Sequence, residues 1–262
     1  MSYQNPKPVL FDDPSQIKET QQIIAEKDGT SNENDYKKLD TVYFAFIDVL
    51  GFKQTFDDIR ITNEEKKAEK FRSVFNYYFE LMNAAKFMEK GQNTGCYAGQ
   101  TSDSLYFYTE RIDFLFQFIK IFSHFNLYAM SEDVFFRGGI AKGNLYQKEQ
   151  YQFYGNSVIY AYLLESNISQ NPIIIIDEDT NKDLQQISEY KNYISFNKNR
   201  NYLLPFYQLG KDIILDLNDD ISKPIDKQKI IDNINKNKKN FEFDAKNYSK
   251  YVFLENESNK KW

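Results

Sequence analysis

The chain has 262 residues, of which 41% are hydrophobic and 17% aromatic, which is enough to form a sizeable core in one large domain. Its net charge of −5 argues against nucleic-acid polymers as partners, because such binding requires clustered cations, whereas a free nucleotide with bound metal ions remains compatible with it. One cysteine, Cys96, and one histidine, His124, exclude a disulfide framework, a thiolate metal cluster and a histidine-rich metal site.

The beginning of the chain is polar. We expect residues 1–39 to form a flexible or loosely docked arm with a short helix at 15–26. The N-terminus lacks the apolar core of a signal peptide, and no run of the sequence reaches the roughly 18 apolar residues of a membrane span. The sequence therefore predicts a cytoplasmic protein without a membrane partner.

A strand, a helix and a hairpin follow the arm. Residues 41–49 are almost continuously apolar, which predicts a strand buried on both faces. Residues 63–90 carry apolar side chains at helical spacing after a helix-start signal. Two short strands are expected at 95–99 and 104–109, on either side of the turn 100–103.

The remaining elements complete an α+β pattern. Expected in chain order are a helix at 112–130 that half-buries His124, a strand at 134–141, further β-segments at 143–146 and 150–154, a helix at 156–166, a strand at 172–176, a short helix near 181–190, one or two strands within 202–215 and a charged helical stretch at 226–251. We interpret the lysine- and asparagine-rich face of this last stretch as solvated surface.

The order of these elements is β-α-β-β-α-β, followed by β-α-β. It predicts an α+β fold with a ferredoxin-like split core and extra C-terminal βα elements. The expected domains are the arm (1–39), the core (40–195) and a C-terminal extension (196–262).

Two aspartates, Asp48 and Asp103, stand at positions that this topology brings together. Asp48 ends the first strand, and Asp103 lies in the turn between the second and third. In a β-α-β-β unit that strand and that hairpin lie side by side, so both carboxylates reach one end of the sheet. Adjacent carboxylates repel unless a cation lies between them. Hard oxygen ligands favour Mg²⁺ or Mn²⁺, and a pair of such ions suits in-line displacement at phosphorus.

An apolar turn containing glycine follows Asp48. Because glycine allows a close approach of the backbone, we expect the N–H groups of Leu50, Gly51 and Phe52 to face a triphosphate.

Each of these residues, and several others in the core, also has an ordinary structural explanation when taken alone. Those explanations are a helix cap or turn (Asp48), a turn (Asp103), a snorkelling edge-strand residue (Arg137), a β-bulge (Gly138 and Gly139), an exposed helix residue (Glu165) and helix N-caps (Asn156 and Ser157). Only the joint order of the residues favours a functional site.

Taken in order, four blocks of the sequence resemble the catalytic domain of class III nucleotidyl cyclases. The blocks are FIDVLGF, SDSLYFY, FFRGGIAKG and YGNSVIYAYLLES, and the resemblance covers about residues 41–176. The matching positions are Asp48 to Phe52, Asp103, Arg137 to Ile140 with Gly143, and Gly155, Val158 and Ala161. The resemblance implies that Asp48, Val49 and Asp103 bind two metal ions, and that Asp48, Asp103 and Arg137 act in catalysis.

The sequence departs from the family where adenylate-type cyclases recognise the purine. Gly99 stands in place of their lysine, and Gln152 in place of their aspartate. We therefore place recognition of the base near Tyr97, Gly99 and Gln152.

A second departure concerns the transition state. Ile159 and Leu163 replace the asparagine and arginine that the family's fourth block carries. Either another cation, such as Arg137 or Lys142, stabilises the developing charge, or activity is lost.

Loss of the purine pair, together with the end of the fourth block at Glu165, is similar to the Pycsar pyrimidine cyclases of bacterial antiphage defence. That resemblance implies a uridylate or cytidylate cyclase that works as a head-to-tail homodimer and whose cyclic product acts on a separate effector. Three alternatives remain open: a purine cyclase with an altered pocket, a degenerate cyclase that binds a nucleotide without turnover, and an α+β scaffold in which these residues are only structural.

Overall fold

The computed structural model describes residues 36–52, 64–85, 95–149, 152–197, 200–203 and 223–261. The helix expected at 15–26 lies outside the described residues. The chain divides into two units, Met1–Lys37 and Lys38–Trp262, and apart from Tyr36 and Lys37 the described residues all belong to the second.

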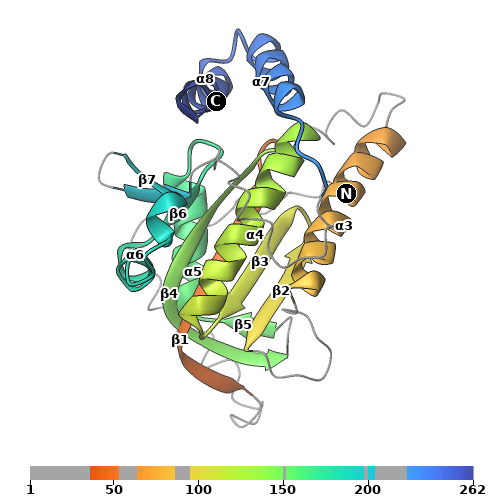
Figure 1. The fold of residues 1–262 in the computed structure, drawn as a ribbon. Coiled ribbons are helices and arrows are strands. Elements are labelled where there is room, and N and C mark those ends of the chain that lie inside the picture. The colour runs from red at the N-terminus through yellow and green to blue at the C-terminus, as the bar shows by residue number, and fades with distance from the viewer. Residues whose placement is uncertain are drawn as a thin grey trace, which may run out of the picture. The chain divides into compact units, whose positions relative to one another are not determined.

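The second unit is an α+β structure. Its helices and strands are, in chain order, β1 (Lys37–Val49), α3 (Glu64–Ala84), β2 (Cys96–Thr101), β3 (Ser104–Thr109), α4 (Ile112–Ser131), β4 (Phe136–Glu149), β5 (Gln152–Tyr154), α5 (Asn156–Leu163), the π-helical segment η2 (Leu164–Ile168), β6 (Ile174–Ile176), α6 (Glu178–Leu184), the 3-10 helix η3 (Tyr190–Asn192), β7 (Ile194–Asn197), β8 (Arg200–Leu203), α7 (Lys227–Asn240) and α8 (Ala245–Lys261) (Figure 1).

Among the described residues, the strands form one eight-stranded mixed sheet. Its order is β2-β3-β1-β4-β6-β8-β7, and β5 pairs with β4. The pairs β1–β3 and β2–β3 are antiparallel, and β4–β6 is parallel. In this register Asp48 lies opposite Ser104, so the end of β1 meets the β2–β3 hairpin as the sequence predicts.

Several predicted boundaries are wrong. The pieces expected at 134–141 and 143–146 form one continuous strand, β4, and the strands β7 and β8 begin before residue 202. The helical stretch expected at 226–251 is two helices, α7 and α8, each with an aspartate at its start. Asp226 and Asp244 accept hydrogen bonds from backbone N–H groups there, which separates the two helices.

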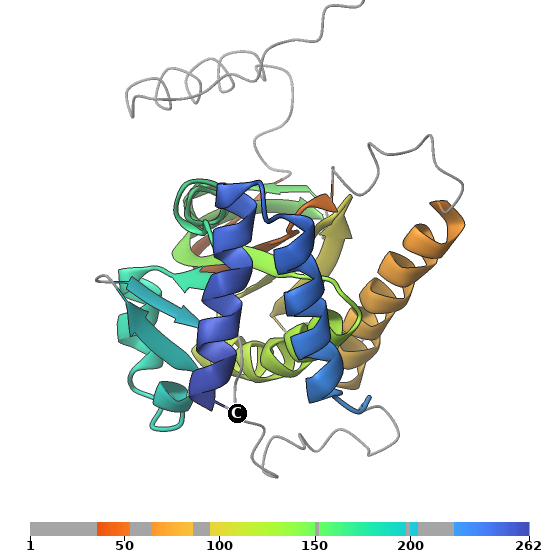
Figure 2. The same cartoon turned by 90° about the horizontal axis from the view of Figure 1, so that it is seen from above.

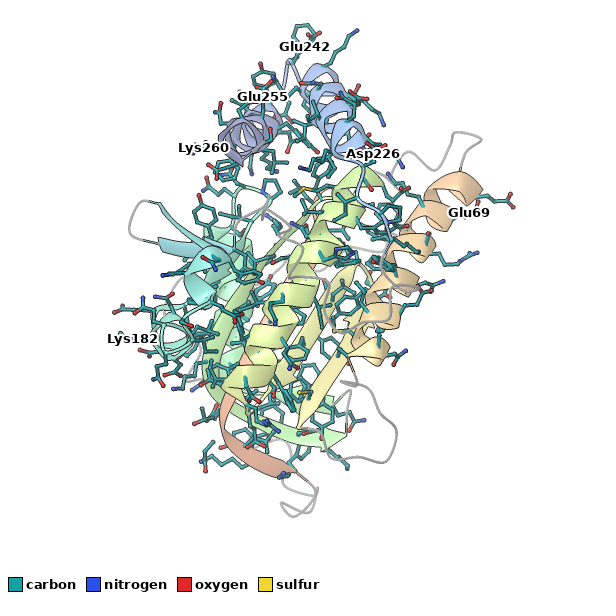
Figure 3. All side chains as sticks on the ribbon, in the orientation of Figure 1. Glu69, Lys182, Asp226, Glu242, Glu255 and Lys260 are labelled. Atoms are coloured by element: carbon teal, nitrogen blue, oxygen red, sulfur yellow. The ribbon has the colours of Figure 1, made fainter. Side chains whose placement is uncertain are left out.

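The first strand explains the layers of the fold. Tyr43, Ala45 and Ile47 pack in a core with side chains from α3, α4 and α6, whereas Val42 and Phe44 pack on the opposite face, in a cluster that includes Ala161 of α5. Burial on both faces accounts for the continuous apolar run. Charged residues such as Glu69 and Lys182 point away from these layers (Figure 3).

The histidine is more deeply buried than expected. His124 is 8% exposed, and its Nε2 atom lies 2.8 Å from the hydroxyl oxygen of Tyr77. It is a core residue of α4. Among the described residues, no helix has both the length and the apolar character needed to cross a membrane.

The helices α7 and α8 lie side by side (Figure 2). They pack on the end of α4 and the beginning of β4 through an apolar cluster. Its buried members are Leu127, Met130, Phe135, Ile230, Ile234, Tyr251 and Leu254. Phe135 of this cluster accepts a backbone hydrogen bond from Leu50, the residue that follows β1. The cluster therefore places the polar face of the helix pair beside the end of β1.

Candidate functional site

A cavity of about 940 Å³ lies where β1 ends, and its size is within the range of small-molecule sites. The ends of β1 and of the β2–β3 hairpin line it together with parts of β4, α3, α7 and α8. Its charged residues include Asp48, Asp103, Arg137, Lys70 and Lys250. The structure thus brings together the three residues that the sequence proposes as catalytic.

Asp48 is held in place at the edge of this cavity. The hydroxyl of Ser104, its partner in the sheet register, donates a hydrogen bond of 3.1 Å to Asp48 Oδ1. Burial, together with the smaller effect of the neighbouring Asp103, raises the pKa of Asp48 to about 6 against the opposing effects of Ser104 and Arg137. The two carboxylates are therefore close enough to oppose each other's charge, as the topology predicts.

Arg137 connects Asp48 to a buried glutamate. Its Nη2 atom lies 3.8 Å from Asp48 Oδ2, and its Nε atom lies 2.7 Å from Glu165 Oε1, although without the angle of a hydrogen bond. Glu165 is 3% exposed, and burial raises its pKa to about 7 despite the nearby guanidinium. The interpretation of Glu165 as an exposed helix residue is wrong, because its side chain is buried. The interpretation of Arg137 as an edge-strand residue is also wrong, because β4 lies between β1 and β6.

The paired glycines of β4 allow close packing and do not form a bulge. A Cβ atom on Gly138 would lie 2.5 Å from the carbonyl oxygen of Phe46, and one on Gly139 would lie 2.3 Å from that of Ala161. The irregularity of β4 occurs later, between Gln147 and Glu149. Glycine at 138 lets the backbone of β1 approach β4, and glycine at 139 lets α5, and with it the segment that carries Glu165, lie against the sheet.

The turn after Asp48 differs in part from the prediction. Val49, Leu50, Gly51 and Phe52 all line the cavity, and Gly51 adopts a φ of 77°, which favours glycine. However, the N–H of Leu50 donates a 2.8 Å hydrogen bond to the carbonyl of Phe135. That donor is therefore not directed at a phosphate, which corrects the role expected for Leu50.

The residues proposed for base recognition lie elsewhere. Tyr97 stacks on Tyr108 with ring centroids 4.7 Å apart, and Gln152 is exposed on β5. A Cβ atom on Gly99 would lie 2.2 Å from the ring of Tyr106, so this ring occupies the space above the glycine. None of Tyr97, Gly99 and Gln152 is among the described residues that line the cavity.

Lys142, named as a possible source of positive charge, also lies elsewhere. Its Nζ atom pairs with Asp183 Oδ2 of α6 at 2.6 Å. This ion pair attaches α6 to β4. Lys142 is not among the described residues that line the cavity.

The C-terminal helices contribute residues to the site that were not predicted from the sequence. Lys236, Asn237 and Asn240 of α7, and Lys246, Asn247 and Lys250 of α8, line the cavity. The interpretation of this face as plain solvated surface is therefore wrong. A signal was present, because each set recurs at the spacing of one helix face.

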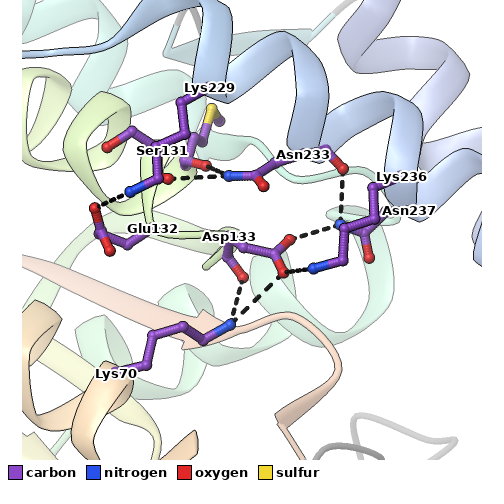
Figure 4. Close-up of polar contacts among 9 residues, drawn as sticks. Lys70, Ser131, Glu132, Asp133, Lys229, Asn233, Lys236 and Asn237 are labelled. Carbon is purple, nitrogen blue, oxygen red and sulfur yellow. Dashed lines mark hydrogen bonds and ion pairs between the residues drawn. The ribbon is translucent and has the colours of Figure 1, made fainter. Parts of the chain in front are cut away.

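Asp133 fixes α7 over the cavity (Figure 4). Its carboxylate lies 2.7 Å from Lys236 Nζ and 3.8 Å from Lys70 Nζ, and it accepts a 2.6 Å hydrogen bond from the side chain of Asn237. Asn233 donates to the carbonyl groups of Met130 and Ser131 at the end of α4. Two of the cavity's lysines are thus paired with a carboxylate that belongs to the structural frame.

The donor set near Asp48 suits a hard divalent cation. Within the described ranges, no group of three or more His, Cys, Asp and Glu side chains is arranged to hold a metal ion. Asp48 and Asp103 nevertheless offer carboxylate oxygens whose charges oppose each other, and a cation between them would offset that repulsion. The residues present are therefore compatible with Mg²⁺ or Mn²⁺ by their chemistry.

No protein-family model and no curated protein matches this chain.

Proposed function

We propose that this protein is a pyrimidine nucleotide cyclase that converts UTP or CTP into the 3′,5′-cyclic monophosphate and pyrophosphate. The observation that carries the proposal is the meeting of Asp48, Asp103 and Arg137 in one cavity of nucleotide size. The strand order β2-β3-β1-β4, with α3 and α4 on the same face, supports a ferredoxin-like core of the class III cyclase type.

The reaction would be an in-line displacement at phosphorus. The oxygen of the ribose 3′-hydroxyl attacks the α-phosphorus and forms the cyclic ester bond. The bond from the α-phosphorus to the bridging oxygen breaks, pyrophosphate leaves with the electron pair, and the hydroxyl proton passes to water. Two Mg²⁺ or Mn²⁺ ions held by Asp48, Val49 and Asp103 would lower the pKa of the hydroxyl and neutralise phosphate charge.

The protein's own residues would position and stabilise these charges. Ser104 fixes the rotamer of Asp48 through its 3.1 Å hydrogen bond. Glu165, 2.7 Å from Arg137, keeps the guanidinium at the cavity, where it balances negative charge that develops at phosphorus. Catalysis of this kind depends on orientation and on preorganised charge.

A second copy of the chain would complete the site. Tyr97, Gly99 and Gln152 lie outside the Asp48 cavity, so they could contact the base only if a head-to-tail partner placed them there. Exposed aromatic side chains of Tyr160 and Tyr162 on α5, 48% and 52% exposed, favour such an interface. In this proposal the cyclic product acts on a separate effector in the cytoplasm, in antiphage defence.

A second candidate function is nucleotide binding without turnover. Ile159 and Leu163, both partly buried on α5, offer no polar group for a transition state. This hypothesis predicts metal-dependent nucleotide binding without release of pyrophosphate.

The test is incubation of the purified protein with ATP, GTP, CTP or UTP in the presence of Mn²⁺, with products identified by mass. We expect a cyclic pyrimidine monophosphate that is absent with Asp48→Ala and retained with Asp179→Ala, an exposed aspartate of α6. A cyclic purine would favour a purine cyclase with an altered pocket. Absence of any product from the folded protein would overturn the cyclase proposal.

A further inference from the structure

The helix α8 supplies a cationic wall to the cavity. Lys246, Asn247 and Lys250 lie about one helical turn apart and line the same cavity as the end of β1. Asp48 and Asp103 come from the sheet, together with Arg137, whereas Lys246 and Lys250 come from α8, so this carboxylate pair and these two ammonium groups enter the cavity from different elements. An elongated anion that carries metal ions at one end would match this separation of charge.

Lys250 is unusual among these residues because it is buried. The residue is 9% exposed, and its ammonium donates a 2.8 Å hydrogen bond to Asn247 Oδ1. In the part of the chain that the structure describes, no carboxylate lies within ion-pair distance of this ammonium. Burial lowers the pKa of Lys250, and the like charges of Arg137 and Lys246 lower it further against the weaker effect of Asp244.

The partly buried ammonium of Lys250 is costly without an anion, because removing a charge from water is unfavourable unless partners replace the lost hydration. Other cations of the cavity already have such a partner, because Lys70 and Lys236 both pair with Asp133. Lys250 and Lys246 instead lie near each other and near Arg137, and an anionic ligand between them would relieve this repulsion.

We propose that Lys250, with Lys246 and Asn247 of α8, binds the terminal phosphates of a polyphosphate chain whose other end lies at Asp48 and Asp103. The inference rests on the proposed function for the identity of the ligand, a nucleoside triphosphate. It assigns to the C-terminal helix pair the role of holding the leaving pyrophosphate. Lys250 and Lys246 would then supply positive charge that the apolar residues Ile159 and Leu163 cannot provide.

The experiment measures the binding of inorganic tripolyphosphate to the full chain by calorimetry, in a buffer with a chelator so that no divalent cation takes part. Lys250→Met keeps most of the buried stem and removes the charge, and Lys246→Gln removes the neighbouring charge. Lys239→Met is the matched control, because Lys239 is an exposed residue of α7 that does not line the cavity. Each variant is checked for folding by circular dichroism and thermal melting.

We expect Lys250→Met to weaken tripolyphosphate binding by about tenfold or more and Lys246→Gln to weaken it less, with no change for Lys239→Met. Lys250→Arg, which keeps the charge, should retain most of the affinity. If Lys250→Met does not fold, the loss with Lys246→Gln against the Lys239 control decides. Equal binding by wild type and the α8 variants, or equal weakening by the control, would overturn the inference.

Failure of this inference and failure of the proposed function give different results. Lys250-dependent binding of tripolyphosphate without a cyclic product supports the phosphate site and contradicts the cyclase. A cyclic product formed by Lys250→Met with an unchanged KM for the nucleotide supports the cyclase and contradicts the phosphate site.

Discussion

The guanidinium of Arg137 and the carboxylate of Glu165 lie 2.7 Å apart, from Nε to Oε1, on the face of the sheet that α5 covers. The pair joins the beginning of β4 to the π-helical segment η2. Because Glu165 is 3% exposed, its carboxylate depends on this partner for compensation.

Replacement of Glu165 by glutamine should raise the free energy of unfolding near pH 8 by about 1 kcal/mol, because burial raises the pKa of Glu165 to about 7 and its ionised form therefore opposes folding. The gain should shrink as the pH falls from 7 towards the ordinary carboxyl value of 4.5, because the wild-type carboxyl is then protonated in the folded state. Urea denaturation at pH 8 and at pH 5 measures both values. Glu178→Gln on the exposed face of α6 is the control, and a loss of stability for Glu165→Gln at pH 8 would show that the ion pair with Arg137 outweighs the cost of burying the carboxylate.

The substitution Asp48→Asn should increase stability and abolish activity. Asp48→Asn removes a partly buried charge that Asp103 opposes, and an asparagine can still accept the hydrogen bond from Ser104. In metal-free buffer near pH 8 we expect the variant to be more stable by about 1 kcal/mol, yet inactive. Thermal melting and the product assay measure the two effects. A clear loss of stability would show instead that Asp48 is a structural anchor, and Asp179→Asn should change neither quantity.

Asp133 should control the attachment of α7. Its backbone has a φ of 59°, a conformation that asparagine also tolerates, so Asp133→Asn isolates the effect of the charge. We expect a loss of about 1–2 kcal/mol and faster hydrogen exchange in α7, because Lys70 and Lys236 lose their shared partner. Hydrogen exchange followed by mass spectrometry locates the change. Asp232→Asn on the same helix is the control, and unchanged exchange in α7 would argue against Asp133 as its attachment.

The buried imidazole of His124 should make the free energy of unfolding depend on pH. Burial lowers its pKa in the folded state, so the unfolded chain binds the proton more readily. The contribution of the neutral imidazole is therefore fully present above its unfolded pKa, near 6.5, and is lost as the pH falls through the folded value. The free energy of unfolding of wild type should fall relative to that of His124→Gln as the solution is acidified. A constant difference between the two proteins across this window would contradict the burial of His124.

Much of the sheet and the acidic half of the site follow from local patterns. The apolar run that becomes β1 and the hairpin turn that holds Asp103 place two carboxylates at one sheet end, and the register of Asp48 opposite Ser104 agrees with that prediction. Chain order decides this relationship, because a strand and the neighbouring hairpin have few ways to pair. The two glycines of β4 likewise indicate that another segment packs closely against this strand, but the sequence does not show which segment it is.

The place of the α7 and α8 lysines in the site depends on tertiary structure. Nothing local distinguishes Lys250, which is buried at the cavity, from Lys239, which is exposed on α7. Glu165 is a similar case, because its burial depends on how closely α5 approaches Gly139. Helix spacing determines which side chains share a face, whereas only long-range packing of the apolar cluster around Phe135 determines what that face meets. The sequence by itself therefore determined the pair of carboxylates, and the docking of α7 and α8 decided which positive charges lie near them.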